Sequence, residues 1–409
     1  MACVATEARL RLEDFYAAER CEECGMCLFR CPTLGLTLEQ AQEEVGRLRR
    51  GEPPRFIDRR CASCYSCDTW CPHDCNPYGL ILHHWYRRYL ERGLPVRALP
   101  AMPLEAVNNT SVAMRHHTPR ERELVEEWRR NAEDPQRVAE GGGTVLYAGC
   151  NALMFPCLLD TSLLGGLTVI GDKSLCCGEV YFRLGLFDVV ERQARVLEER
   201  FRRLEVRRLV VFCSAGYNML TNVLPRRFGA RFDFETRYLF EDILQRAERG
   251  EVELQRLAPR RAAVSDTCHA KVLGRDLMEI PRKLLGMMGL EVAEMPHSRE
   301  YSVCCGAACG ARRQNPLDMG RQAVAQWEEA RAAGADMLVS YCATCLLLLH
   351  IGRMVHPTRM PLYHLMELLM QSAGEEPPHE LAARRARRVF TGVMAHGLPR
   401  MLSRRRVRL

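Results

Sequence analysis

The sequence contains 21 cysteines, and most of them fall into groups with short, repeated spacing. CEECGMCLFRCP at 21–32 and CASCYSCDTWCP at 61–72 share one pattern: the cysteines are separated by two, two and three residues, and a proline follows. Runs of this kind hold [4Fe–4S] clusters, with three thiolates from one run and the fourth from the other. We therefore expect two clusters. The first cysteine set is Cys21, Cys24, Cys27 and Cys71, and the second cysteine set is Cys61, Cys64, Cys67 and Cys31.

A pair of zinc sites is the structural alternative for these two runs. Zinc sites typically take two cysteines from each run and do not need the proline, so the alternative carries little weight. Cys75 is an extra thiol just after the second run, and we expect it to be a bystander.

Two further cysteine groups lie in the remaining three quarters of the chain. One contains Cys150, Cys157, Cys176, Cys177 and Cys213, and the other contains Cys268, Cys304, Cys305, Cys309, Cys342 and Cys345. In a reducing compartment, clustered cysteines indicate metal binding or catalysis more often than disulfides.

Composition limits the class of protein. The 409 residues suggest two or three domains, and a net charge of +7 with interspersed acidic residues gives no basic groove for nucleic acid. No stretch is long and apolar enough for a transmembrane helix, and the N-terminus lacks the features of a signal peptide. We therefore expect a cytoplasmic protein without a membrane-spanning segment.

The elements that must position these cysteines change in type along the chain. Residues 1–100 are expected to be helical, with helices at 37–50, where Thr37 and Gln40 form a capping box, and at 80–90. A linker at 101–142 carries one helix near 119–131. Buried parallel strands are then predicted at 144–149, 167–171, 208–212, 262–266, 290–295 and 336–341, and helices at 187–204, 235–249 and 316–333.

The strands and cysteines repeat. Cys177 and Cys213 are separated by 35 residues, and Cys305 and Cys342 by 36 residues. Each interval holds a helix and ends on a strand that delivers a cysteine at its carboxyl end, where α/β proteins place their sites. The predicted division is a helical ferredoxin-like domain at 1–100, a linker at 101–142, a first module at 143–255, a second module at 256–370 and a basic C-terminal tail at 371–409.

SDTCHAKVLGRD at 265–276, the pair Pro281–Arg282, CCGAACG at 304–310 and GADMLVSYCATC at 334–345 carry a specific resemblance. The chain resembles the cysteine-rich CCG family, shared by heterodisulfide reductase catalytic subunits and the iron–sulfur subunits of glycolate, lactate and anaerobic glycerol-3-phosphate dehydrogenases. Over about residues 15–365 its layout is similar to that of D-type heterodisulfide reductase subunits. The fold implied is α + α/β: a helical two-cluster ferredoxin domain followed by two repeated Rossmann-like CCG modules.

The resemblance implies a third cysteine set, made of Cys268, Cys304, Cys305, Cys342 and Cys345, as the active site. In the heterodisulfide reductase branch, five such thiolates hold a noncubane iron–sulfur cluster that contacts the substrate disulfide. Adjacent cysteines can bind neighbouring irons from one loop, and Gly306 frees the backbone for this. Cys309 is expected to be a packed bystander and His269 a hydrogen-bonded structural residue.

The first module departs from the family pattern, because Gly216 stands where the last cysteine is expected. The fourth cysteine set is therefore Cys150, Cys176, Cys177 and Cys213, with Cys157 as an extra thiol. Four thiolates suffice for a cubane or for zinc, and an empty module is the third alternative. We expect any metal there to be structural.

The leading function is an iron–sulfur electron-transfer and catalytic subunit of a multisubunit, heterodisulfide-reductase-like oxidoreductase. The alternative is a relay subunit of a flavin-dependent dehydrogenase or quinone-linked complex, and a zinc-stabilised scaffold is a third. No G-x-G-x-x-G fingerprint for flavin or NAD is present, so the chain needs partners: a flavoprotein, a ferredoxin or a membrane quinone subunit.

The tail at 384–409 carries nine arginines and no acidic residue, with Val389, Phe390, Val393 and Met394 on one helical face. Three interpretations stay open: a solvated tail, a segment that docks onto an acidic partner subunit, and peripheral attachment to anionic lipid.

Overall fold

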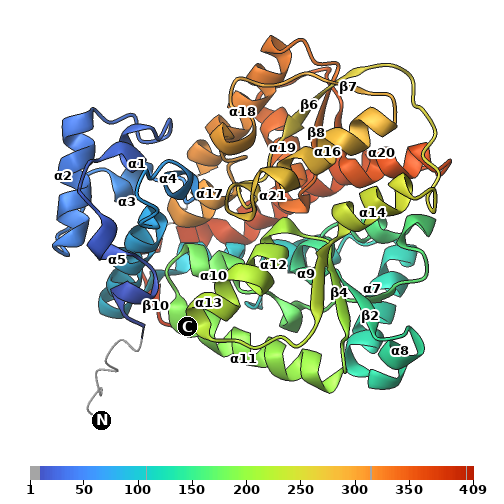
Figure 1. Cartoon of the computed structure of the whole chain (residues 1–409), viewed down its shortest axis with the longest axis horizontal. Coiled ribbons are helices and arrows are strands. Elements are labelled where there is room, and N and C mark those ends of the chain that lie inside the picture. The colour runs from blue at the N-terminus through green and yellow to red at the C-terminus, as the bar shows by residue number, and fades with distance from the viewer. Residues whose placement is uncertain (1–9, 107, 314–315, 402) are drawn as a thin grey trace.

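The computed structural model describes residues 10–106, 108–313, 316–401 and 403–409 (Figure 1). A helical N-terminal part lies at one end of the molecule, beside two units that are each built on a parallel sheet. Helices combined with two four-stranded parallel sheets agree with the expected α + α/β class.

The N-terminal part consists of short helices around the two cysteine runs. The predicted helix at 37–50 is confirmed, and its Thr37 hydroxyl accepts the amide of Gln40 while the Gln40 side chain accepts the amide of Thr37. The second predicted helix is longer than 80–90, because Pro77 supplies a preset first turn. These helices are α1 (Met26–Phe29), α2 (Leu38–Arg49), α3 (Ile57–Arg60), α4 (Ser66–Thr69) and α5 (Pro77–Arg92).

Both sheets are parallel and share one strand order. The first sheet has the order β3-β2-β4-β5 and the second has the order β7-β6-β8-β9, so the first strand of each unit lies in the interior next to its second and third strands. The strands of the first α/β unit are β2 (Thr144–Tyr147), β3 (Thr168–Ile170), β4 (Arg208–Val211) and β5 (Glu235–Tyr238). Those of the second α/β unit are β6 (Arg261–Ser265), β7 (Glu291–Val292), β8 (Met337–Ser340) and β9 (Leu362–His364).

All six predicted strands are present, but the fourth strand of each sheet was missed. Residues 235–249 were expected to be helical throughout, yet they begin with β5 and turn helical only at α14 (Leu239–Glu248). The strand Glu235–Tyr238 is polar and short, and its pairing with β4 overrides its local preference. β9 is a three-residue strand paired with β8, and its sequence has no long apolar run from which a strand could be predicted.

Helices cover the sheets and fill the segment expected as a linker. The predicted helices at 187–204 and 316–333 are confirmed as α11 (Phe187–Arg203) and α18 (Pro316–Ala332), and the one near 119–131 is α7 (Pro119–Glu133). The other α-helices are α6 (Asn109–Met114), α8 (Pro135–Glu140), α9 (Gly149–Ala152), α10 (Glu179–Arg183), α12 (Ser214–Asn218), α13 (Leu224–Phe228), α15 (Ala270–Leu273), α16 (Arg275–Met287), α17 (Ala307–Arg313), α19 (Ala343–Val355) and α20 (Leu365–Ser372). Shorter turns are η1 (Leu12–Asp14), η2 (Ala18–Arg20), η3 (Val96–Ala101), η4 (Pro156–Leu159), η5 (Ser162–Leu164), η6 (Lys173–Leu175), η7 (Met219–Val223) and η8 (Arg299–Tyr301).

The apolar core joins the parts to one another. One large cluster holds the N-terminal helices against the first α/β unit, where the Phe15 and Phe187 rings stack with centroids 4.3 Å apart. A second large cluster spans both sheets. A small third cluster packs Ala62 and Cys64 of the second run against Cys304 and Cys309. The second run and the second α/β unit are therefore in direct contact.

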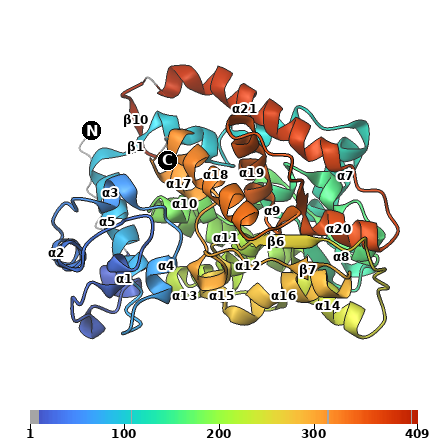
Figure 2. The ribbon, with the colours of Figure 1, turned by 90° about the horizontal axis from the view of Figure 1, so that it is seen from above.

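The basic C-terminal segment is part of the fold, not a solvated tail. α21 (His379–Met401) runs along the outside of the molecule, and the chain then returns to the N-terminal part (Figure 2). Arg385 is fully buried and pairs with Glu121, and the half-buried Val393 packs against the core. β10 (Arg406–Val407) pairs antiparallel with β1 (Leu94–Pro95). The apolar face predicted on this helix therefore binds the chain itself.

Candidate functional site

The first cysteine set gathers around one pocket of the N-terminal part. Cys21, Cys24, Cys27 and Cys71 all line it, together with Gly25 and Pro72. The pKa of Cys27 is raised, first by burial and then by the nearby thiols of Cys71, Cys21 and Cys24. The cysteine from the second run thus lies with three cysteines of the first. Cys75 lines the same pocket and lies beside Cys71 and Cys21.

The second cysteine set is also brought together, and it adjoins the first. Burial and the neighbouring Cys64 thiol raise the pKa of Cys31 to about 11. Burial raises the pKa of Cys67 well above its ordinary value, with further contributions from Asp68, Cys61, Cys27 and Cys64. Because Cys27 acts on Cys67, the two sets are close neighbours.

The two runs share an unusual backbone. Glu23 and Ser63 lie two residues after the first cysteine of each run, with φ of 54° and 57°. Gly25 and Tyr65 each lie four residues after the first cysteine of their run, with φ of 73° and 65°. Positive φ is costly for residues other than glycine, and such strain gathers at functional sites. The two cysteine runs therefore share the same pair of strained turns.

Four cysteine sulfurs accept backbone amides in one repeated arrangement. In each case the donor lies two residues after the cysteine. The pairs are Glu23 N to Cys21 Sγ at 3.4 Å, Ser63 N to Cys61 Sγ at 3.3 Å, Gly178 N to Cys176 Sγ at 3.5 Å and Gly306 N to Cys304 Sγ at 3.3 Å. Amide donors of this kind stabilise sulfur that carries negative charge.

The third cysteine set lies at the carboxyl ends of β6 and β8. Cys304 and Cys345 each donate a hydrogen bond to Cys305 and lower its pKa to about 5, although burial opposes this. Cys342 begins α19 and lies beside Cys345. Cys268, the fifth member, lies near Cys304.

Gly306 has the positive φ that the sequence predicted. Its φ is 104°, and a Cβ atom at this position would lie 2.5 Å from the carbonyl oxygen of Met319. Only glycine fits there, so the turn after the adjacent cysteines is fixed by sterics. Cys309 is buried in the same small cluster, and its backbone amide donates to Cys304.

The fourth cysteine set touches the third. Cys150 donates a hydrogen bond to Cys176, which lowers the pKa of Cys176, and Cys177 lies nearby. Cys213 donates to Cys342 of the other α/β unit, and this contact is the largest reason that the pKa of Cys342 lies well below its ordinary value. The fourth set, at which any metal was expected to be structural, therefore adjoins the third set. Cys157 lies apart, near Glu121 and Arg385.

An aromatic ring occupies the place of the missing fifth cysteine. Cys213 and Cys342 each lie two residues beyond their strand, so Gly216 is the counterpart of Cys345. A Cβ at Gly216 would lie 3.3 Å from the Tyr147 ring. Tyr147 is fully buried, and its hydroxyl donates to the carbonyl of Leu175.

Two buried cations also border the third set: Arg183 lies outside the quoted motifs, whereas Lys271 lies within SDTCHAKVLGRD. Arg183 in α10 reaches Cys268, with 3.0 Å between Nη2 and Sγ, and Lys271 in α15 is buried against the second run. His269 Nε2 lies within hydrogen-bonding distance of Arg183 and Glu179, and its Nδ1 lies near the Asn218 amide, contacts that suit the structural role expected for it. Burial and the Arg183 charge lower its pKa well below the ordinary value. Local spacing gives no signal for Arg183, because Cys268 is 85 positions away from it and Ser63 is 120 positions away.

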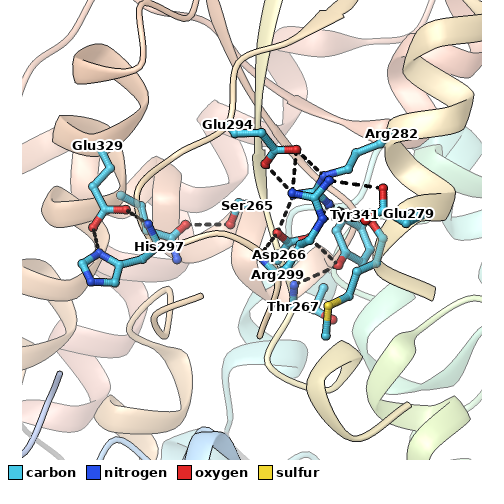
Figure 3. Close-up of polar contacts among 12 residues, drawn as sticks. Ser265, Asp266, Thr267, Glu279, Arg282, Glu294, His297, Arg299, Glu329 and Tyr341 are labelled. Atoms are coloured by element: carbon cyan, nitrogen blue, oxygen red, sulfur yellow. Dashed lines mark hydrogen bonds and ion pairs between the residues drawn. The ribbon is translucent and has the colours of Figure 1, made fainter. Parts of the chain in front are cut away.

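A buried polar network holds the loops of the third set in place (Figure 3). Asp266 accepts two hydrogen bonds from Arg282, at 3.0 and 2.8 Å. It also accepts the Tyr341 hydroxyl at 3.1 Å and the backbone amide of Arg299 at 2.7 Å. Asp266 lies two residues before Cys268, and Tyr341 directly precedes Cys342. One carboxylate therefore ties together three loops around the third set.

The site does not have the geometry of a single-ion centre, and the chain has no membrane span, as far as its described residues go. Among residues 10–106, 108–313, 316–401 and 403–409, no three His, Cys, Asp or Glu side chains are arranged to hold one metal ion. Within the same ranges, no helix combines the length and apolar character needed to cross a bilayer.

Residues 262–350 match the model of the CCG cysteine-rich domain. The D subunit of the dihydromethanophenazine:CoB–CoM heterodisulfide reductase of Methanosarcina mazei is 23% identical over 399 residues, covering 88% of this chain and 94% of the relative. A probable iron-sulfur-binding oxidoreductase of Bacillus subtilis, FadF, is 28% identical over 209 residues, covering 50% of this chain and 29% of the relative. The EtfAB:quinone oxidoreductase of Syntrophomonas wolfei is 24% identical over 192 residues, covering 45% and 26%. The chain thus contains a CCG domain and is homologous, at low identity, to proteins named as oxidoreductases or their subunits.

Proposed function

We propose that this CCG-domain protein is the iron–sulfur electron-transfer and catalytic subunit of a multisubunit oxidoreductase of the heterodisulfide reductase type. The observation that carries the proposal is the continuity of the cysteine sets. The first set adjoins the second at Cys27 and Cys67, the second meets the third at Cys64 and Cys304, and the third meets the fourth at Cys342. A series of adjacent redox groups is what electron transfer across a subunit requires.

The donor sets fit iron–sulfur groups. Each of the first two sets offers four thiols from two C-x2-C-x2-C-x3-C-P runs, which suits a [4Fe–4S] cluster. The third set offers five thiols, so we propose the noncubane cluster of the heterodisulfide reductase branch there. Amide donors to Cys21, Cys61, Cys176 and Cys304 would stabilise the sulfur charge of such groups. By donor number the fourth set suits a four-thiolate cluster or zinc, and the lack of a single-ion arrangement among the described residues favours the cluster.

The proposed reaction converts a disulfide, two electrons and two protons into two thiols. The cluster of the third set would supply electrons and bind substrate sulfur when present. The chain's own residues shape the site: Gly306 sets the turn that presents Cys304 and Cys305, and Asp266 fixes the loops.

We infer domains at 1–100, 143–255 and 256–370, joined by the linker at 101–142. Residues 371–409 pack across these parts and hold them together. The compartment we expect is the cytoplasm, where thiols stay reduced.

A relay subunit without disulfide chemistry is the second candidate. FadF and the EtfAB:quinone oxidoreductase match about half of this chain, and neither name refers to disulfide reduction. Under this alternative the chain passes electrons between a flavoprotein and a quinone-linked partner. In the first candidate, the partner that supplies electrons is a flavoprotein, a ferredoxin or a membrane quinone subunit, and contact with a membrane is made through it.

Anaerobic purification with native partners, followed by iron and sulfide analysis and EPR spectroscopy, tests the shared part of both candidates. A protein without labile sulfide would refute both of them and favour a zinc scaffold. Thiol release from a panel of small disulfides, measured with reduced protein, separates the two candidates. Release that disappears in Cys305→Ala supports the reductase, whereas quinone reduction without any thiol release supports the relay.

A further inference from the structure

Two buried cations lie between the second and the third cysteine sets. Arg183 comes from α10 of the first α/β unit, and Lys271 comes from α15 of the second. Both are buried, with 4% and 7% of their surface exposed. Neither belongs to a cysteine run, and the proposed function does not use them.

Arg183 connects three parts of the chain. Its Nη1 donates to the carbonyl of Ser63 in the second run, and its guanidinium lies over the Tyr65 ring, 4.9 Å from the centroid. Its Nη2 is 3.0 Å from Cys268 Sγ. Glu179, one turn earlier on the same helix, pairs with the Nε atom. The guanidinium therefore spans the gap between the second run and a member of the third set.

Lys271 makes a second connection across the same gap. Its Nζ is 2.5 Å from Ser66 Oγ and 2.5 Å from the carbonyl oxygen of Ser302. Ser66 Oγ is in turn 3.2 Å from Cys64 Sγ, and Ser302 lies two residues before Cys304.

The charge balance indicates what these cations face. Glu179 already forms an ion pair with Arg183, whereas Lys271 donates to a neutral hydroxyl and a neutral carbonyl. Burying a cation is costly unless negative charge lies close by. Thiolates that carry iron–sulfur groups on both sides would supply that charge.

We propose that Arg183 and Lys271 form a cationic bridge that raises the reduction potentials of the groups held by the second and third cysteine sets. This inference rests on the proposed function. Each transfer removes one electron from the donor group and adds one to the acceptor, and no covalent bond changes. A cation stabilises the more negative, reduced state of either neighbour. The residues therefore act on the potentials through charge, and they are positioning residues rather than ligands.

The test compares neutral and charged replacements at the same positions. Lys271→Gln keeps donors for Ser66 and Ser302 but removes the charge, and Lys271→Arg keeps the charge. Arg183→Gln and Arg183→Lys form the second pair. Arg246→Gln is the matched control, because Arg246 is partly buried and is held by Asp242 and the carbonyl of Leu163. Midpoint potentials are measured on the holoprotein by redox titration with EPR detection, at matched iron content.

We expect each neutral variant to lower the midpoint potential of at least one of the two groups by about 59 mV. This shift is about a tenfold change in the equilibrium constant for one-electron reduction. The charged variants and Arg246→Gln should stay near the parent value. Unchanged potentials in both neutral variants would overturn the bridge. Loss of iron in Lys271→Gln but not in Lys271→Arg supports a need for charge, whereas loss in both overturns it. A parent protein without clusters would refute the proposed function instead.

Discussion

The Asp266–Arg282 pair offers the sharpest test of how the third cysteine set is held. The Asp266 side chain is 0% exposed and that of Arg282 is 6% exposed. Burial opposes the charge on Arg282, but Glu294 and Asp266 more than offset this and hold its pKa above the ordinary value. Arg282→Met removes the partner and leaves the carboxylate with two neutral donors, the Tyr341 hydroxyl and the amide of Arg299.

The expected cost follows from that isolation. Breaking a buried ion pair by removing one partner costs about 3–5 kcal/mol, because the other charge stays buried without compensation. Because the orphaned carboxylate anchors the loops of Cys268 and Cys342, the third set should bind its group poorly even in the folded fraction. The first and second sets lie outside this network and should keep theirs.

The assay is anaerobic denaturant unfolding followed by circular dichroism, with iron analysis and EPR on the same samples. Glu329→Gln is the control, since its partner His297 belongs to the same region but is 41% exposed at the side chain, and such a pair contributes about 1 kcal/mol or less (Figure 3). An Asp266→Asn and Arg282→Met double variant should cost less than the sum of the two single changes. If Arg282→Met costs under about 1 kcal/mol and keeps every EPR signal, the network does not hold the loops.

The remaining predictions concern the crossed cysteine pairing, the buried His350, the Tyr147–Gly216 contact and the C-terminal strand. Cys71→Ala should abolish the EPR signal of the first set and spare that of the second, and the reverse pattern would contradict the crossed pairing. Burial lowers the pKa of His350 to about 3, so between pH 6.5 and 3 only the unfolded chain gains this proton. The free energy of unfolding should therefore fall by about 1.4 kcal/mol per pH unit from this group as pH decreases, and His350→Leu should show a flatter profile by that amount. Gly216→Cys combined with Tyr147→Ser should make the EPR signal of the fourth set resemble that of the third. An unchanged spectrum would contradict the idea that the Tyr147 ring takes the space of a fifth cysteine. Deleting 403–409 removes the β1–β10 pairing and should speed proteolysis of the N-terminal part without loss of cluster signals.

Much of the fold follows from local signals in the sequence. The capping box at Thr37 and the apolar runs of the interior strands were sufficient, because caps and continuous hydrophobic stretches act on short segments. The outer strands β5 and β9 were missed because each gains its structure from pairing with a neighbour rather than from its own residues. The charge of the C-terminal segment suggested exposure, but Arg385 is buried by its pairing with Glu121, 264 positions earlier.

In the candidate site, too, contacts between segments that are distant in the sequence could not be predicted. Cysteine spacing predicted the first and second sets, and the family resemblance implied the third; these assignments stay predictions. The spacing could not indicate the contact between Cys213 and Cys342, because that contact depends on how the two α/β units pack. The roles of Arg183 and Lys271 could not be predicted for the same reason. Each contacts a cysteine run to which it has no sequence relation.

In the first α/β unit, the Tyr147 ring fills space beside Gly216, where the fifth cysteine is missing. Tyr147 ends β2 and Ser265 ends β6, and each lies three residues before the first cysteine of its unit. The second unit thus combines the small Ser265 with Cys345, whereas the first combines the large Tyr147 with Gly216. Because protein interiors are close-packed, a ring can take this place only where the facing side chain is absent, and Tyr147 packs against Gly216 in that way. We therefore expect the first unit to use four thiols and to hold a different group from the third set, which it contacts through Cys213.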